Sequence, residues 1–179
     1  MTDWPKDLSV AGSRFTLDCA HRVVNDRDPS LPTELKADRS EDQTLREEEG
    51  VLFEYNIRTE LIALHKVIDL ALINDYKERT EATIRAIKRG DAIIVGAALP
   101  SSEGRSGAPD ILVKGPSKSD GTSTYFPVDI KNHKPLDGEK KPTNQIVSSL
   151  KEFSKDQASE IEIGPGKPDS DDSLILSHY

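Results

Sequence analysis

An acid and an amine stand two residues apart in one apolar stretch of this 179-residue chain, where Asp129 and Lys131 alternate with Val128 and Ile130. Side chains two apart on a β-strand project to the same face. We therefore expect Asp129 and Lys131 to point together, while Val128 and Ile130 face the core. A carboxylate can bind a metal ion, and a neighbouring amine can orient or deprotonate a water molecule. The spacing predicts a hydrolytic site; the alternative is a charged surface pair on an edge strand.

A second carboxylate, Asp110, follows Pro109 at the start of the preceding apolar stretch. If the two stretches are neighbouring antiparallel strands, Asp110 lies beside Asp129. Two carboxylates that converge at the edge of a sheet suit a hard cation such as Mg²⁺. An unrelated fold, in which the pattern is accidental, predicts instead that Asp110 and Asp129 lie far apart.

The strongest helical pattern covers residues 51–73, where apolar residues recur at helical spacing: Phe53, Ile57, Leu61, Leu64, Val67, Ile68 and Leu72. Glu60 comes three residues after Ile57 and four before Leu64, so it falls on this apolar stripe. A buried carboxylate is costly unless it is paired or metal-bound. Glu60 is therefore a third candidate acid. An ion pair with Arg58 or Arg85 is an equally good alternative.

Several shorter elements should position these side chains. A helix over about residues 75–89 is expected to end at Gly90. Strands are expected within residues 91–100, 109–115 and 124–133, and their close spacing predicts an antiparallel meander. Pro127 favours an edge or bulged position for the third strand. The predicted fold class is α/β, with one long helix packed on a mixed, mostly antiparallel sheet.

The chain divides into four parts by composition. Residues 1–50 are a helical and irregular lead-in, with a short helix expected over 13–24 and helical structure near the end. Residues 51–133 form the expected core. Residues 134–172, rich in Lys, Pro, Gly, Ser and Asp, predict a long flexible insertion. Residues 173–179 are expected to begin a closing helix.

Composition bounds the class of protein. With 35% hydrophobic and 31% charged residues, no apolar run near ~20 residues and no signal-peptide pattern, we expect a cytoplasmic protein without a membrane span. The lone cysteine, Cys19, excludes an internal disulfide and a multi-cysteine zinc or iron–sulfur site within one chain. The net charge of −8 counts against nucleic acid, but much of the excess acid lies in residues 41–49 and 156–172, outside the candidate site.

The motif and its context resemble a known class of nuclease. Pro109-Asp110, then eighteen residues, then Asp129-Ile130-Lys131 matches the PD-(D/E)xK motif, and a helix followed by three strands is the order of that nuclease core. The segments RGDAIIVGAAL, SGAPDILVKG and YFPVDIKNHK resemble RecB-like nucleases, which are relatives of the CRISPR-associated RecB-like exonucleases. The resemblance implies a restriction-endonuclease-like core and Mg²⁺- or Mn²⁺-dependent cleavage of DNA that is single-stranded or has ends. It further implies a helicase or second nuclease domain as a fused or separate partner.

The resemblance also implies roles for particular residues. Asp110, Asp129 and Lys131 would be catalytic, and the metal would be bound by Asp110, Asp129, Glu60 and the carbonyl of Ile130. No iron–sulfur cluster is expected. Possible accessory residues are His65, Arg105, His133 and Tyr179. The main alternative is a catalytically weak or inactive module that binds nucleic acid or protein on the same fold.

Overall fold

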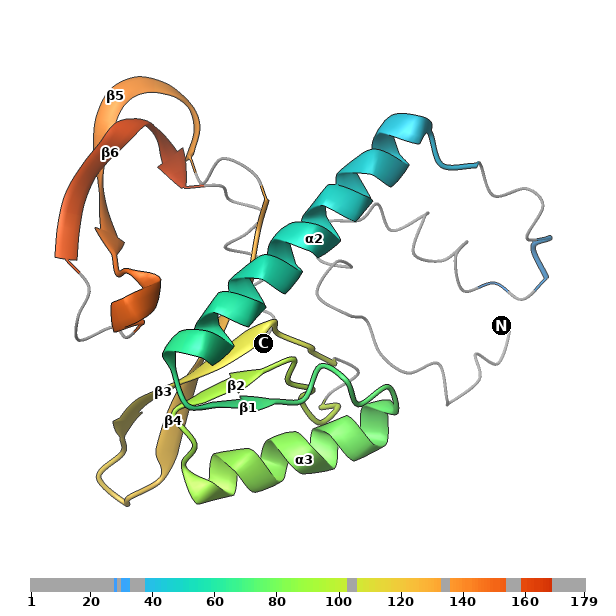
Figure 1. The fold of residues 1–179 in the computed structure, drawn as a ribbon, viewed down its shortest axis with the longest axis vertical. Coiled ribbons are helices and arrows are strands. Elements are labelled where there is room, and N and C mark those ends of the chain that lie inside the picture. The colour runs from blue at the N-terminus through green and yellow to red at the C-terminus, as the bar shows by residue number, and fades with distance from the viewer. Residues whose placement is uncertain are drawn as a thin grey trace, which may run out of the picture.

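The computed structural model describes residues 28, 30–32, 38–102, 106–132, 136–153 and 159–168. Within these ranges the core is an α/β unit of two α-helices and a four-stranded mixed sheet (Figure 1). Its elements are α2 (Glu41–Leu64), β1 (Val67–Asp69), α3 (Tyr76–Arg89), β2 (Ile93–Val95), β3 (Ile111–Ser117) and β4 (Ser123–Val128). The helices expected over 13–24 and 173–179 lie outside the described residues.

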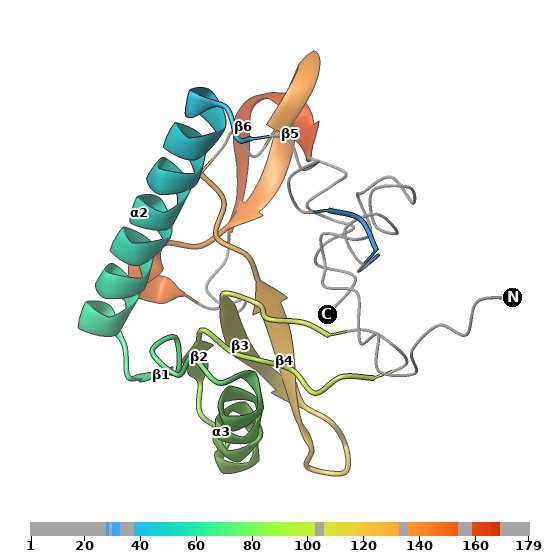
Figure 2. The same cartoon turned by 90° about the vertical axis from the view of Figure 1, so that its right-hand side faces the viewer.

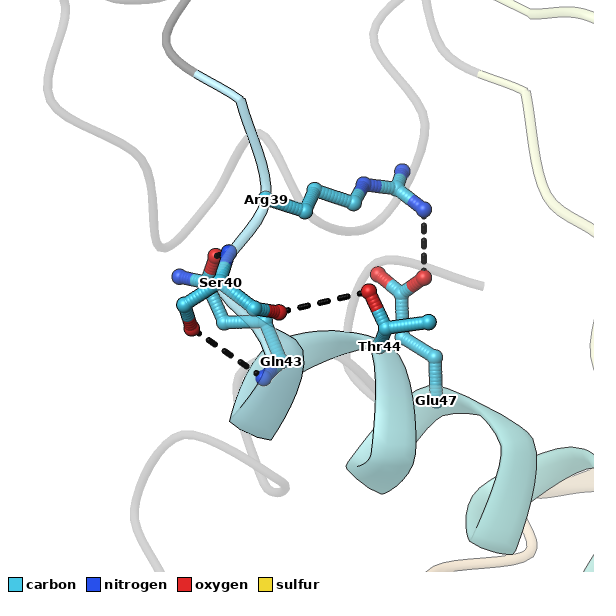
Figure 3. A network of polar contacts seen from close by, with 5 residues as sticks. All are labelled: Arg39, Ser40, Gln43, Thr44 and Glu47. Atoms are coloured by element: carbon cyan, nitrogen blue, oxygen red, sulfur yellow. Dashed lines mark hydrogen bonds and ion pairs between the residues drawn. The ribbon is translucent and has the colours of Figure 1, made fainter.

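The long helix α2 begins earlier than its apolar pattern predicted, at Glu41 rather than at residue 51. Ser40 is its N-cap and forms a capping box with Gln43: the hydroxyl accepts from the backbone N–H of Gln43, and the Gln43 side chain accepts from the N–H of Ser40 (Figure 3). The Thr44 hydroxyl donates to the carbonyl of Ser40. This local cap, and not an apolar stripe, therefore fixes the start of the helix. Along the part of the chain that the structure describes, no helix is long and apolar enough to cross a membrane.

The expected helix over 51–73 also ends early. The helix stops at Leu64, and the N–H of His65 caps it by donating to the carbonyl of Leu61. Val67–Asp69 then forms β1, which pairs in parallel with Ile93–Val95. The prediction was wrong here because strand pairing with a buried neighbour outweighs a helical apolar pattern, and β-branched residues favour the strand.

The sheet has the order β1-β2-β3-β4, with β1 parallel to β2 and the other two pairs antiparallel. The mixed, mostly antiparallel sheet and the meander of its last three strands are therefore confirmed. Helix α3 ends at Gly90, as expected, with φ of 76° at this residue. It connects two parallel strands, so the β1-α3-β2 crossover is an element that the meander prediction did not include. Within the described sheet β4 is an edge strand, which accommodates Pro127.

Alternating side chains of the strands build two apolar clusters, one on each face of the sheet. On one face Ile93, Val95 and Ile111 pack with Leu61 of α2. On the other face Ile94 and Leu112 pack with Ala82 and Ala86 of α3. The sheet therefore lies between α2 and α3, as Figure 1 shows. The expectation that the long helix packs on the sheet is confirmed.

Residues 134–172, expected to be a flexible insertion, contain regular structure. Strands β5 (Leu136–Val147) and β6 (Ser159–Pro168) pair antiparallel in a separate sheet, and η3 (Leu150–Glu152) is a short 3-10 helix between them. The two sheets lie apart in both views (Figures 1 and 2). Leu150 and Phe153 nevertheless pack against the cluster on the α2 side of the core. Backbone pairing needs no apolar side chains, so this polar composition is compatible with paired strands.

Candidate functional site

Asp110 and Asp129 meet at one end of the sheet. The last paired residues of β3 and β4 are Ile111 and Val128, so Asp110, directly before β3, stands opposite Asp129, directly after β4. The backbone N–H of Ile130 donates to Asp110 Oδ2 at 2.6 Å. The expectation that 129–131 lie within a strand is wrong, because a side-chain carboxylate here takes the place of the backbone acceptor that a strand would supply. The two carboxylates are therefore near each other, and the charge of Asp129 acts on the pKa of Asp110. The accidental-motif alternative expected them to lie far apart.

Asp129 and Lys131 contact each other, although they follow β4 and do not lie within a strand. Lys131 Nζ lies 3.2 Å from Asp129 Oδ2. The side chain of Asp129 is only 8% exposed and that of Lys131 is 36% exposed. Val128 and Ile130 pack against the apolar cluster on the α2 side. An acid this buried does not fit the surface-pair alternative, because an exposed ion pair keeps both partners in water.

The carboxyl group of Asp110 is held in a setting that disfavours its charge. Burial, together with the nearby negative charges of Glu54 and Asp129, raises its pKa from 3.8 to about 6. The N–H of Ile130 and the charge of Lys131 act on the pKa in the opposite direction. Removal from water is the largest of these effects. A bound cation would offset the same burial and repulsion.

The acid that α2 brings close to Asp110 is Glu54, not the predicted Glu60. Leu61 is fully buried against the sheet. Glu54 is seven residues before it, so it points within roughly 20° of the same direction, while Glu60 is turned away by about 100°. Both glutamates are exposed, but it is the charge of Glu54, and not that of Glu60, that acts on the pKa of Asp110. The apolar pattern did not indicate Glu54, because Leu64 was expected to lie in the core, whereas it is 39% exposed.

The two arginines considered as partners of Glu60 form ion pairs with other acidic residues. Arg58 donates to Asp69 Oδ2 at 2.8 Å, and Arg85 lies 4.0 Å from Glu81. The Arg58–Asp69 pair joins α2 to β1.

Gly96 fixes the backbone of Asp110. Its N–H donates to the carbonyl of Asp110 at 2.7 Å. Gly96 has φ of 64°, and a Cβ on it would lie 2.6 Å from the Cα of Ala71. Only glycine fits this combination of a left-handed backbone and close approach. The turn after β2 therefore positions one of the two carboxylates, a role that the sequence analysis did not assign.

Among the accessory candidates His65 lies within the described residues, and its side chain contacts another part of the structure. His65 Nε2 lies 2.5 Å from the carbonyl of Leu150, so His65 joins the end of α2 to η3. Arg105, His133 and Tyr179 lie outside the described residues, as do Cys19 and the closing segment.

The donors present fit a hard cation only in part. The carboxylates of Asp110 and Asp129 are oxygen ligands of the kind that Mg²⁺ and Mn²⁺ prefer, and the carbonyl of Ile130 is a third. Over the ranges that the structure describes, no three His, Cys, Asp or Glu side chains form a metal-binding group. A small protein ligand set suits Mg²⁺, which keeps several water ligands. In the described ranges the protein therefore offers only a small ligand set, which water molecules would have to complete around an ion.

Comparison with protein-family models, curated proteins and solved structures finds no match to this chain.

Proposed function

We propose that this chain hydrolyses DNA phosphodiester bonds with Mg²⁺ or Mn²⁺ at Asp110 and Asp129. The observation that carries the proposal is the meeting of two carboxylates from neighbouring strands, one of them in contact with Lys131 at 3.2 Å. The motif order and the resemblance to RecB-like nucleases support it, and with it a restriction-endonuclease-like core. The substrate class in this proposal is DNA that is single-stranded or has ends.

Each residue of the site has a separate task. Asp110 and Asp129 bind the cation, and Glu54 adds negative charge from α2. When bound, the cation lowers the pKa of a water molecule and stabilises negative charge on the phosphorus centre. Lys131 is half-exposed, so its ammonium is open to substrate while Asp129 holds it in place. There it orients the attacking water and offsets the charge that develops on the phosphate oxygens.

The test compares cleavage of end-labelled single- and double-stranded DNA in Mn²⁺ by the full chain and three variants. Asp110→Asn and Lys131→Gln should each lower the rate by about 100-fold or more, as removal of a group that stabilises transition-state charge does. Glu60→Gln, on the exposed side of α2, should cleave like the unaltered chain. Circular dichroism should show the same fold in all four proteins. The proposal is wrong if the unaltered chain cleaves neither single- nor double-stranded DNA. It is also wrong if Asp110→Asn cleaves DNA at the rate of the unaltered chain.

The second candidate is a binding module without catalysis on the same fold. The net charge of −8 and the engagement of Lys131 by Asp129 favour it. Titration calorimetry with Mn²⁺ separates the two candidates. A nuclease must take up the ion in a way that Asp110→Asn abolishes, whereas a binding module need not take it up at all.

A further inference from the structure

Helix α2 carries a second apolar stripe on the side that the sheet does not cover. Its members are exposed by 43–60%: Leu45, Leu52, Tyr55 and Ile62. At about 100° per residue, all four point roughly 100–200° round the helix from Leu61, which packs on the sheet. In Figure 2 helix α2 forms the left margin of the described structure, and no described element lies beyond it. Within the described residues, this stripe therefore has no element packed on it.

The spacing of this stripe is that of a coiled coil. Two sets of residues, each with a seven-residue period and offset from each other by three residues, occupy the a and d positions of a heptad: Leu45, Leu52 and Thr59, and Glu48, Tyr55 and Ile62. We call these six residues the outer seam. All six are exposed and four of them are apolar. A helix with the same period fits such a seam, because its side chains insert between those of α2.

We propose that the outer seam pairs with the outer seam of a second copy of this chain, with the two α2 helices antiparallel. In an antiparallel coiled coil each a residue faces a d residue of the partner. With Leu52 opposite the partner's Tyr55, Leu45 lies opposite the partner's Ile62, and Thr59 lies opposite the partner's Glu48. Apolar residues therefore meet apolar residues, and the two polar residues of the seam meet each other.

Neighbouring registers are less favourable. A shift of one heptad in one direction sets Leu52 against the partner's Glu48, which places a charge against an apolar side chain. A shift in the other direction leaves Leu45 beyond the end of the partner's helix, which stops at Leu64. The pattern of polar and apolar residues therefore selects a single antiparallel register. The proposal does not depend on the proposed nuclease activity.

Charge selects the antiparallel direction. Residues 41–49 hold five acidic side chains against one arginine. A parallel pair would set these acidic turns beside the same turns of the partner, where like charges repel. The antiparallel pair sets them beside residues 58–66 of the partner, which hold two basic side chains and one acid, and brings Glu41 level with the partner's Lys66. The charges of the two copies are therefore complementary in this direction alone.

Sedimentation velocity of the full chain tests the pairing. Over about 5–500 µM the chain should show a monomer–dimer equilibrium with a Kd on the order of 10–100 µM, as expected of a short seam with polar layers. Leu52→Glu introduces a charge into two layers of the dimer and should weaken association by about 30-fold or more. Leu72→Glu makes the same change at a leucine outside α2 that is 80% exposed, and it should leave association unaltered.

Both leucines are exposed, so neither change should prevent folding, and Tyr55→Glu repeats the test with the same expectation if Leu52→Glu misfolds. A chain that stays monomeric at every concentration would overturn the proposal and leave the seam to a different protein. Equal association of Leu52→Glu and Leu72→Glu would overturn it as well.

Disulfide cross-linking tests the direction of pairing. Cys19 is the only cysteine, so Glu48→Cys and Thr59→Cys in a Cys19→Ser background give two single-cysteine chains. The antiparallel register sets these two cysteines in one layer, whereas two copies of Glu48→Cys lie about 16 Å apart along the helix axis, and a disulfide needs Cα atoms within about 7 Å. A mixture of the two chains should therefore form the mixed disulfide about tenfold faster than either chain links to itself. Non-reducing gels and peptide mass mapping measure the products; faster linkage of like chains would indicate a parallel pair and overturn the proposal.

Discussion

The carboxyl group of Asp110 is subject to opposing effects within one small volume. Burial and the charges of Glu54 and Asp129 favour the protonated form, while the N–H of Ile130 and the ammonium of Lys131 favour the ionised form. A raised pKa in the folded state means that folding holds the proton more tightly than the unfolded chain does. Asp110 therefore links protein stability to pH, and in the proposed function it would also link pH to cation binding.

Replacement of Asp110 by asparagine should remove this pH dependence. Between about pH 4 and pH 6 the folded chain binds more protons at this residue than the unfolded chain, so the free energy of unfolding falls as pH rises through that window. The asparagine side chain stays neutral, and its carbonyl oxygen can still accept from the N–H of Ile130. In metal-free buffer the variant should match the unaltered chain near pH 4 and exceed it by about 1–2 kcal/mol at pH 7.5, after allowance for partial screening by solvent. Urea unfolding at the two pH values measures this; an equal difference at both would contradict it.

Glu54 and Glu60 form a matched pair on one helix. Because Glu54 raises the pKa of Asp110, Glu54→Gln should lower that pKa, which carboxyl NMR titration detects. The same change should weaken Mn²⁺ binding by about 10-fold, as loss of a group next to metal ligands commonly does. Glu60→Gln, on the exposed side, should change neither quantity. If Glu54→Gln and Glu60→Gln changed the pKa of Asp110 and Mn²⁺ binding equally, Glu54 would have no specific role at the site.

At the scale of elements, the site depends on a turn and on where strands end. Gly96 follows β2, and Asp110 precedes β3, and the hydrogen bond between their backbones joins the two. The loop between them returns the chain to the edge of the sheet where Asp129 leaves β4. The two carboxylates therefore lie at the ends of strands. There the hydrogen bonds between the backbones of β3 and β4 stop, and a side chain accepts from the next backbone N–H instead.

Gly96→Ala should destabilise the protein strongly. The added Cβ would lie 2.6 Å from the Cα of Ala71, in addition to the cost of a left-handed backbone. Gly121 is a matched control, since its φ is 82° and nothing lies within 4 Å of a Cβ there. Gly121→Ala should cost about 1 kcal/mol and Gly96→Ala more than about 2 kcal/mol, measured by urea unfolding. Similar costs would show that the turn tolerates the clash.

At the scale of the whole molecule, two sheets of different character share one chain. The four-stranded sheet is covered by α2 and α3, whereas the β5-β6 sheet joins the core through residues that follow β5. Leu150 and Phe153 pack on the α2-side cluster, and the carbonyl of Leu150 contacts His65. We infer that η3 attaches the second sheet to the first.

Leu150→Ala should loosen this attachment. Loss of a partly buried leucine should cost about 1–3 kcal/mol of stability, less than at a fully buried site. Hydrogen exchange should rise more in 136–153 than in α3, because α3 packs on the other face of the sheet. Lys151→Ala, at an exposed position of the same 3-10 helix, should leave both measurements unchanged. A uniform rise in exchange for Leu150→Ala would mean that η3 belongs to the core itself.

The sequence by itself determined the features that depend on local chemistry. Glycine ended α3, and short turn-rich connections predicted the meander. It also predicted that Asp110 meets Asp129, since antiparallel neighbours bring one strand's start to the next strand's end.

Only the tertiary structure decided the rest. Residues 67–69 have a helical pattern, yet they form a strand because Ile93–Val95 offers a buried partner. The acid beside Asp110 is Glu54, because the packing of Leu61 sets the rotation of α2, and the apolar pattern alone left that rotation open. The physical reason is the same in both cases. A segment can adopt several local structures of similar free energy, and packing against residues distant in the sequence selects one of them. The sequence of the segment does not contain the residues against which it packs.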